Sequence, residues 1–234
     1  KTLFPYTTLF RSTVIFSSTK GILTILVMQL VEQGLLDIDK PVAHYWPEFA
    51  QNGKSNITVK MVLRHRAGMN TTERDLTFDE VLNPISVEEV LASQKPIYPP
   101  DSGFVYHALT IGYLLGKIIF NITGKRVNQL LQEQISKPLN VPIWIGIPES
   151  HNLDIARLKS DMPDELPLHS VESIPYKQEH AMGFHGLNRR MDSDDQGWND
   201  SRLHRAEIAG AGGISDARSI AKVYSACVNN FHET

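Results

Sequence analysis

The sequence predicts a largely helical globular domain in which β-strands are few. Its 234 residues are 41% hydrophobic and 21% charged, an ordinary composition for a globular domain. Apolar residues recur at the helical period in GILTILVMQLV and ALTIGYLLGKIIFNITG, whereas alternating strand patterns are scarce. Helices with so little sheet to pack against are unusual in a complete domain. We therefore expect that strands of this fold lie outside the chain.

The first twelve residues differ in character from the rest of the chain. Residues 2–12, TLFPYTTLFRS, resemble at every position the translation of a widely used short-read sequencing adapter. We therefore expect residues 1–12 to be an adapter artefact, and residues 13–234 to be one domain truncated at both ends. The alternative is a genuine N-terminal strand, since TLFPYTTLF is rich in residues that favour strands.

The N-terminal third predicts two helices and a connector. The first helix begins at Ser17 or Ser18, carries an apolar stripe, and stops at Gly34. The acids and prolines of LLDIDKPVAHYWPEF predict an irregular connector. ITVKMVLRHRAGM predicts a short helix with Thr58 as its N-cap and Gly68 as its stop.

The rest of the sequence predicts further helices, with one long loop region before the last of them. SVEEVLASQ has the spacing of a capping box, with Ser86 and Glu89 as its members. ALTIGYLLGKIIFNITG and VNQLLQEQIS predict apolar helices, and residues from about 146 to 205 predict a loop-rich excursion. DARSIAKVYSACV predicts a final helix capped by Ser215 or Asp216. The glycines of AGAGGIS just before it indicate a tight turn or a close backbone approach.

Charge and composition argue against several classes of protein. The net charge is -3 and the pI is about 6.3, with no basic run interleaved with aromatics, so we expect no nucleic-acid partner. No apolar run reaches the roughly 20 residues of a bilayer span. The single cysteine, Cys227, cannot form an intramolecular disulfide, and we expect it to pack within a helix.

The tetrapeptide SSTK near the N-terminus carries candidate chemistry. Ser17 and Lys20 have the i, i+3 spacing that places two side chains on one face of a helix, whereas Ser18 would point away. A buried lysine has a lowered pKa and can serve as a base, and a serine at a helix N-terminus gains from the helix dipole. On the tetrapeptide alone, the simpler interpretation is a capping serine and a solvated surface lysine.

The surroundings of this tetrapeptide resemble the β-lactamase-related serine hydrolases. This family includes class C β-lactamases, D-alanyl-D-alanine carboxypeptidases, S-x-x-K esterases and LACTB-like proteins. The similar segments are FSSTKGILTILVMQLVEQGLLDIDKPVAHYWPEF, then ITVKMVLRHRAGM, then PPDSGFVYHALTIGYLLGKII. The resemblance runs from about residue 13 to residue 234. It implies an α/β (α+β) fold of the serine β-lactamase and penicillin-binding-protein type, in which helices flank an antiparallel sheet.

The resemblance also implies a catalytic set. Ser17 is the nucleophile, Lys20 and Tyr106 take its proton, and an ester or amide is cleaved through a covalent acyl-enzyme without metal or organic cofactor. Many peptidases and β-lactamases of the family have Tyr-x-Asn where this chain has YHA, so Ala108 replaces the asparagine. This departure resembles the esterase and LACTB-like branch and argues against an efficient β-lactamase. His107 is either a polar substitute or a flanking residue.

The family's third motif, Lys or His followed by x-Gly, is not found in this chain. In the family that motif lies on a strand beyond the region matched by GAGGISDARSIAKVYSACV, and it supplies an oxyanion-hole N–H. His232 is followed by Glu-Thr, so we do not assign it to the motif. We therefore expect the 234-residue chain by itself to be poorly stable and inactive, although its full-length parent is an enzyme.

The sequence disfavours two other functions and leaves a third open. A Ser-His-Asp α/β-hydrolase is disfavoured because no G-x-S-x-G motif occurs, and a metal site because no H-E-x-x-H occurs and HAMGFH has unsuitable spacing. A catalytically inactive scaffold or filament-forming protein of the same family stays open.

Overall fold

The computed structural model describes residues 12–151, 154–159 and 192–228, and within them helices predominate over a small sheet. The helices of the first half are α1 (Ser18–Glu32), α2 (Val42–Tyr45), the 3-10 helix η2 (Pro47–Ala50), α3 (Val59–Leu63), α4 (Phe78–Leu82), α5 (Pro84–Ser93) and α6 (Thr110–Thr123). Those of the second half are α7 (Val127–Leu131), the π-helical turn η3 (Gln132–Ser136), α8 (Lys137–Leu139), α9 (Ser201–Arg205) and α10 (Ala217–Val228).

The sheet joins three segments that are far apart in the sequence. β1 (Thr13–Val14), β3 (Gly213–Ser215) and β2 (Trp144–Ile145) form an antiparallel sheet in the order β1-β3-β2. β3 is the middle strand and its three residues are all buried. Because β1 leads directly into α1, this sheet fixes where α1 begins.

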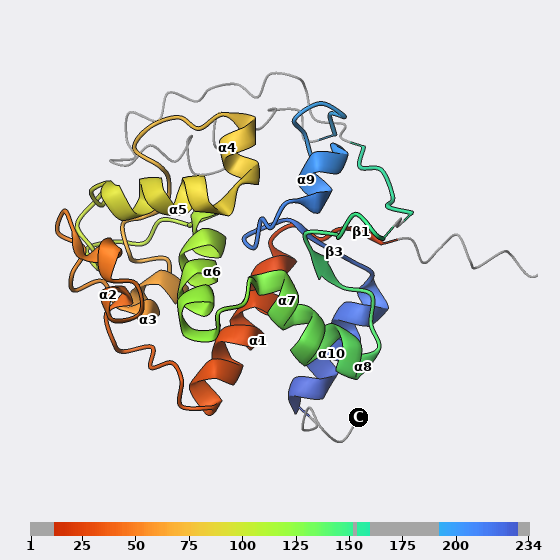
Figure 1. Ribbon diagram of the computed structural model, residues 1–234, viewed down its shortest axis with the longest axis horizontal. Coiled ribbons are helices and arrows are strands. Elements are labelled where there is room, and N and C mark those ends of the chain that lie inside the picture. The colour runs from red at the N-terminus through yellow and green to blue at the C-terminus, as the bar shows by residue number, and fades with distance from the viewer. Residues whose placement is uncertain (1–11, 152–153, 160–191, 229–234) are drawn as a thin grey trace, which may run out of the picture.

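Helix α6 lies at the centre of the molecule, between α5 on one side and α1 on the other (Figure 1). Every residue of α6 from Thr110 to Gly116 is buried, so this helix faces protein on all sides. The inward stripe of α1 packs against it in the main core and consists of Ile22, Leu23, Leu26, Val27 and Leu30. The predictions of both helices are confirmed. The predicted stop of the first helix is confirmed as well, since Gly34 adopts a left-handed backbone angle just beyond α1, as Gly124 does beyond α6.

Four local predictions are wrong. α3 ends at Leu63, before Gly68. Asn83 caps α5, which places Ser86 and Glu89 inside that helix; the capping box formed instead is Thr77 with Glu80 on α4. The connector after α1 is not wholly irregular, because it holds α2 and η2. Cys227 is exposed rather than packed in the core.

Other local predictions are confirmed. Thr58 caps α3 by accepting a hydrogen bond from the Met61 N–H, and Asp216 caps α10 by accepting from the N–H groups of Arg218 and Ser219. Of the predicted loop region, residues 152–153 and 160–191 lie outside the described residues, as do residues 1–11. HAMGFH falls in that undescribed part.

A buried carboxylate ties three helices together. Glu88 on α5 is 3% exposed, and its Oε1 lies 2.6 Å from Nη1 of Arg126, at the start of α7. Its Oε2 lies 3.7 Å from Nζ of Lys117 on α6. The attraction offsets the cost of burying these charges only while the set stays together.

Glu88→Ala is therefore expected to lower the free energy of unfolding by about 3 kcal/mol, the low end for a broken buried pair, since the Lys117 and Arg126 side chains left without a partner are 23% and 25% exposed. Glu89→Ala, on the exposed side of the same helix, is the matched control and is expected to change it little. Urea unfolding of both variants measures the difference. Equal midpoints for the two variants would contradict this account of the core.

Candidate active site

The serine predicted as the nucleophile lies in a sharp turn between β1 and α1. Phe16, just before it, has a φ of +44°, a left-handed conformation that is costly for a residue with a large side chain. Ser17 is the N-cap residue of α1 but its side chain makes no capping hydrogen bond. Its hydroxyl is exposed and free to interact with groups other than its own helix.

Thr19 holds this turn against the sheet. It is fully buried; its Oγ1 donates to the Phe16 carbonyl at 2.5 Å and accepts from the Gly213 N–H at 2.9 Å. A Cβ on Gly213 would lie 2.5 Å from that Oγ1, so only glycine fits at this point of β3. The Ile15 N–H also donates to the Gly213 carbonyl, at 2.8 Å. The position of Ser17 therefore depends on β3, which is almost 200 residues away in the sequence.

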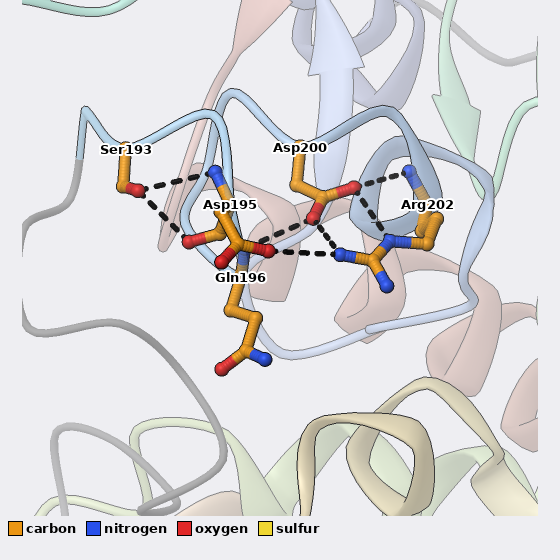
Figure 2. Close-up of polar contacts among 5 residues, drawn as sticks. All are labelled: Ser193, Asp195, Gln196, Asp200 and Arg202. Atoms are coloured by element: carbon orange, nitrogen blue, oxygen red, sulfur yellow. Dashed lines mark hydrogen bonds and ion pairs between the residues drawn. The ribbon is translucent and has the colours of Figure 1, made fainter.

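A second support for the turn comes from the loop before α9. Trp198 is 7% exposed and packs edge-on against the Phe16 ring, with centroids 5.2 Å apart. Asp200, two residues later, is buried, and it caps α9 by accepting from the Arg202 N–H while also pairing with the Arg202 guanidinium at 2.6 Å (Figure 2). The same carboxylate accepts from the Gln196 N–H. These bonds close the loop on either side of Trp198.

The three residues predicted for catalysis meet at the Ser17 hydroxyl. Nζ of Lys20 lies 3.2 Å from Oγ of Ser17, one helical turn along α1. The Tyr106 hydroxyl donates to the same Oγ at 2.7 Å, although it lies 89 residues away in the sequence. Nζ of Lys20 also lies 4.7 Å from the centre of the Tyr106 ring. The simpler interpretation, a capping serine and a solvated lysine, is therefore wrong.

Two backbone carbonyls orient Lys20, and the sequence did not reveal either one. Nζ donates to the Ala108 carbonyl and to the Gly210 carbonyl, both at 2.7 Å. Burial lowers the pKa of the Lys20 amine, and the neighbouring Tyr106 partly offsets that shift. Ala108 has no side-chain amide, and its main-chain carbonyl is what holds the lysine.

The Gly210 carbonyl reaches Lys20 because α6 lets the loop before β3 approach closely. A Cβ on Gly112 would lie 2.1 Å from the Gly210 nitrogen, and a Cβ on Gly210 would lie 2.7 Å from the Leu109 carbonyl oxygen. Both positions therefore require glycine. The close backbone approach predicted from AGAGGIS is confirmed. It brings the Gly210 carbonyl within hydrogen-bond distance of Lys20.

Gly112→Ala is expected to lower the free energy of unfolding by about 1–3 kcal/mol, because the new methyl group overlaps backbone atoms that cannot rotate away. It should also displace the Gly210 carbonyl from Lys20 and slow any reaction at Ser17. Gly116→Ala on the same helix is the control, since its Cβ would meet only the Val127 side chain at 3.4 Å. Thermal unfolding and reaction rates of the pair test this, and equal behaviour would refute it.

The start of α1 also offers a hydrogen-bond donor for a developing negative charge. The N–H groups of Ser18, Thr19 and Lys20 donate to carbonyls within the turn. Among the described residues, the Ser17 N–H has no acceptor. A donor beside the nucleophile is what an oxyanion hole requires.

Two histidines lie behind Tyr106. The His65 ring is 4.8 Å from the Tyr106 ring, and the His107 ring is 5.5 Å from that of His65. His107 is fully buried, so it is not a surface residue that merely flanks Tyr106. Burial lowers the pKa of each imidazole to about 4, so both are neutral near pH 7.

The described residues support no metal site and no membrane span. No cluster of three His, Cys, Asp or Glu side chains able to hold a metal ion occurs in the part of the chain that the structure describes. Nor does any helix there combine the length and the apolarity needed to cross a bilayer.

Known proteins resemble this chain over nearly all of its length. Esterase/beta-lactamase LipL of Mycobacterium tuberculosis is 33% identical over 221 residues, which is 92% of this chain and 50% of that protein. A family VIII carboxylesterase structure superposes with a TM-score of 0.79 at 30% identity, covering 94% of this chain and 56% of that one. For EstA from Arthrobacter nitroguajacolicus Rue61a the TM-score is 0.81 at 30% identity, covering 93% of this chain and 56% of that one.

These likenesses establish the fold, which is that of the β-lactamases and penicillin-binding proteins, with helices around an antiparallel sheet. A structure of a penicillin-binding protein homolog from Caulobacter crescentus agrees, with a TM-score of 0.75 at 30% identity. The chain spans about half the length of the relatives it matches. The model of the Beta-lactamase family matches residues 7–232, and the chain therefore belongs to that family.

Proposed function

We propose that this chain carries the nucleophile and the proton-transfer groups of a serine hydrolase that cleaves an ester or an amide through a covalent acyl-enzyme. The observation that carries the proposal is the position of the Ser17 hydroxyl, in hydrogen-bond contact with both the Tyr106 hydroxyl and the Lys20 amine. A nucleophile beside a base that is itself oriented by further groups is the arrangement that activates a serine.

The hydrogen bonds of Lys20 suggest how it becomes a base. A charged amine has three N–H groups, which match its three oxygen neighbours on Ser17, Ala108 and Gly210. When it loses one proton, the two carbonyls can accept the remaining two. The lone pair is then directed at Ser17. Burial favours that neutral form.

The reaction follows from these contacts. Oγ of Ser17 attacks the carbonyl carbon of the substrate, and its proton passes to Lys20, directly or through Tyr106. The Ser17 N–H is placed to stabilise the tetrahedral oxyanion. As the bond to the leaving alcohol or amine breaks, the Tyr106 hydroxyl delivers a proton to it and regains one from Lys20. Water then attacks the acyl ester, releases the acid and restores the Ser17 hydroxyl.

We propose that esters are cleaved better than β-lactams. The main support is Ala108, which provides a carbonyl to Lys20 but no side-chain amide to bind a substrate amide. Two of the relatives are named for esterase activity, the family VIII carboxylesterase and esterase/beta-lactamase LipL. Phe104, 63% exposed and two residues before Tyr106, adds an apolar surface near the site.

The test compares kcat/KM for p-nitrophenyl acetate and butyrate with kcat/KM for a chromogenic cephalosporin. Because relatives of this chain are about twice as long, we propose that the native gene encodes a longer protein, and the test uses both that protein and the 234-residue chain. We expect the longer protein to hydrolyse the esters faster than the cephalosporin. We expect the 234 residues alone to be inactive, because their relatives are about twice as long. Rapid cephalosporin hydrolysis would overturn the preference for esters, and an inert longer protein would favour the inactive scaffold.

A further inference from the structure

His65 contacts the chain on both sides of Tyr106. Its carbonyl accepts a hydrogen bond from the Val105 N–H at 3.2 Å, and Nδ1 of its ring accepts from the His107 N–H at 3.0 Å. The same ring packs against the ring of Tyr106, with an angle of 48° between the planes. One residue therefore holds the main chain before and after Tyr106 and also the face of its ring.

The fold holds His65 itself in an unusual conformation. It follows α3 with a φ of +57°, a left-handed angle that is uncommon for residues other than glycine, asparagine, aspartate and histidine. Its N–H donates to the Val62 carbonyl at 3.0 Å, and its own carbonyl accepts a second hydrogen bond, from the Tyr98 hydroxyl at 3.2 Å. Hydrogen bonds with Val62, Tyr98 and Val105 hold His65 in this conformation, which histidine adopts more readily than most residues other than glycine.

The protonation of the ring agrees with this role. Nδ1 accepts a hydrogen bond and therefore carries no proton. Burial, with a smaller effect of the Lys20 charge, keeps the pKa of His65 at about 4. Behind it, the Nδ1–H of His107 donates to the Val105 carbonyl, and its Nε2 accepts from the Met69 N–H. Both rings are thus fixed acceptors near pH 7, and their tautomers are set by main-chain donors.

We propose that His65 is a positioning residue that fixes the Tyr106 hydroxyl against the Ser17 hydroxyl, through the His107 N–H, the Val105 N–H and the face of the Tyr106 ring. This inference rests on the proposed function of Tyr106 in proton transfer. His65 itself touches no reacting atom. Its effect is on the geometry of the bond between Tyr106 and Ser17, where a displacement of about 1 Å can cost about 100-fold in rate.

Three substitutions separate the contributions of the ring and of the acceptor. His65→Asn keeps a side-chain acceptor and the left-handed backbone preference but loses the ring. His65→Phe keeps a ring but loses the acceptor, and His65→Ala loses both. His44→Asn is the control, because His44 is exposed on α2. All four are made in the full-length protein.

The proposal predicts which of these variants lose kcat and which keep it. In His65→Phe and His65→Ala, kcat for a p-nitrophenyl ester should fall by about 100-fold while KM changes little. The melting temperature should fall too, because phenylalanine and alanine suit the left-handed backbone less well than histidine, but the loss of kcat should exceed what that fall accounts for. His65→Asn should stay closer to the wild-type kcat, and His44→Asn should equal it. Wild-type kcat in His65→Phe and His65→Ala would overturn the proposal. So would losses of kcat that follow the melting temperature across all variants.

A spectroscopic measurement separates failure of this inference from failure of the proposed function. The protein has seven tyrosines, and with ¹³Cζ-tyrosine the Tyr106 signal is assigned by its loss in Tyr106→Phe. We expect that signal to shift in His65→Phe and His65→Ala and to stay unchanged in His44→Asn. An unchanged Tyr106 signal in every His65 variant would refute the positioning role. If the wild type shows no turnover, the proposed function fails while this signal still decides the role of His65.

Discussion

Ser17→Ala is expected to abolish ester hydrolysis, with kcat reduced by at least about 10³-fold and toward the ~10⁶-fold seen when a catalytic serine is removed from a complete set. The substitution deletes the atom on which the Lys20 and Tyr106 contacts converge. Because Ser17 makes no capping bond and is exposed, the melting temperature should barely change. Initial rates with p-nitrophenyl butyrate, measured beside thermal unfolding, provide the test.

Ser18→Ala is the matched control for that variant. Ser18 is the next residue and is also exposed, but it lies about 100° around the helix and no bond joins it to Lys20 or Tyr106 among the described residues. It should keep wild-type turnover. If Ser18→Ala lost activity and Ser17→Ala kept it, the assignment of the nucleophile would be wrong.

Lys20→Met is expected to be nearly as damaging, with a loss of about 10²–10⁴-fold in kcat, the usual size of a general base contribution. Methionine fills similar space but offers no proton acceptor, so the Ser17 hydroxyl keeps its proton when it attacks. The carbonyls of Ala108 and Gly210 also lose their donor. Stopped-flow measurement of the acylation step would show the loss at that step.

The pH dependence tests the same role of Lys20. Only the neutral amine can accept the proton, so kcat/KM should rise with pH as Lys20 deprotonates. Burial lowers the pKa of this amine, so the rise should be centred below the ordinary lysine value. Lys20→Arg, which stays charged, should show low activity with no such rise. A wild-type profile that is flat, or that falls over this range, would contradict a lysine base.

The long helices could be predicted from the sequence because their apolar stripes are strong. In α1 the residues spaced three and four apart face the core, whereas α6 is buried on all sides from Thr110 to Gly116. The stop at Gly34 could be predicted because it needs the left-handed backbone that glycine provides. The boundaries of the short helices were harder to predict, because several neighbouring residues can each cap or start the same helix. Ser86 and Glu89 have the spacing of a capping box, yet Asn83 and Pro84 start α5 earlier, since proline suits the first turn of a helix.

The candidate site could be predicted only in part. The Ser17 and Lys20 pair follows from helical spacing, but the approach of Tyr106 was implied by family resemblance, because nothing local indicates a contact over 89 residues. The carbonyls of Ala108 and Gly210 have no sequence signature, since every residue has a carbonyl. Only the glycines of AGAGGIS, which include Gly210, indicated that the backbone lies unusually close to another segment there. His65 lies in ITVKMVLRHRAGM, one of the segments that carry the family resemblance, but its role depends on a backbone angle that the sequence does not indicate.

The most direct test of the covalent mechanism is to identify the acylated residue. The full-length protein is mixed with excess p-nitrophenyl butyrate, quenched in acid during the first turnover, digested and analysed by mass spectrometry. The account predicts a butyryl group on the hydroxyl of Ser17, absent from Ser17→Ala and retained in Ser18→Ala. Turnover without any acylated peptide, or an adduct that stays in Ser17→Ala, would contradict it.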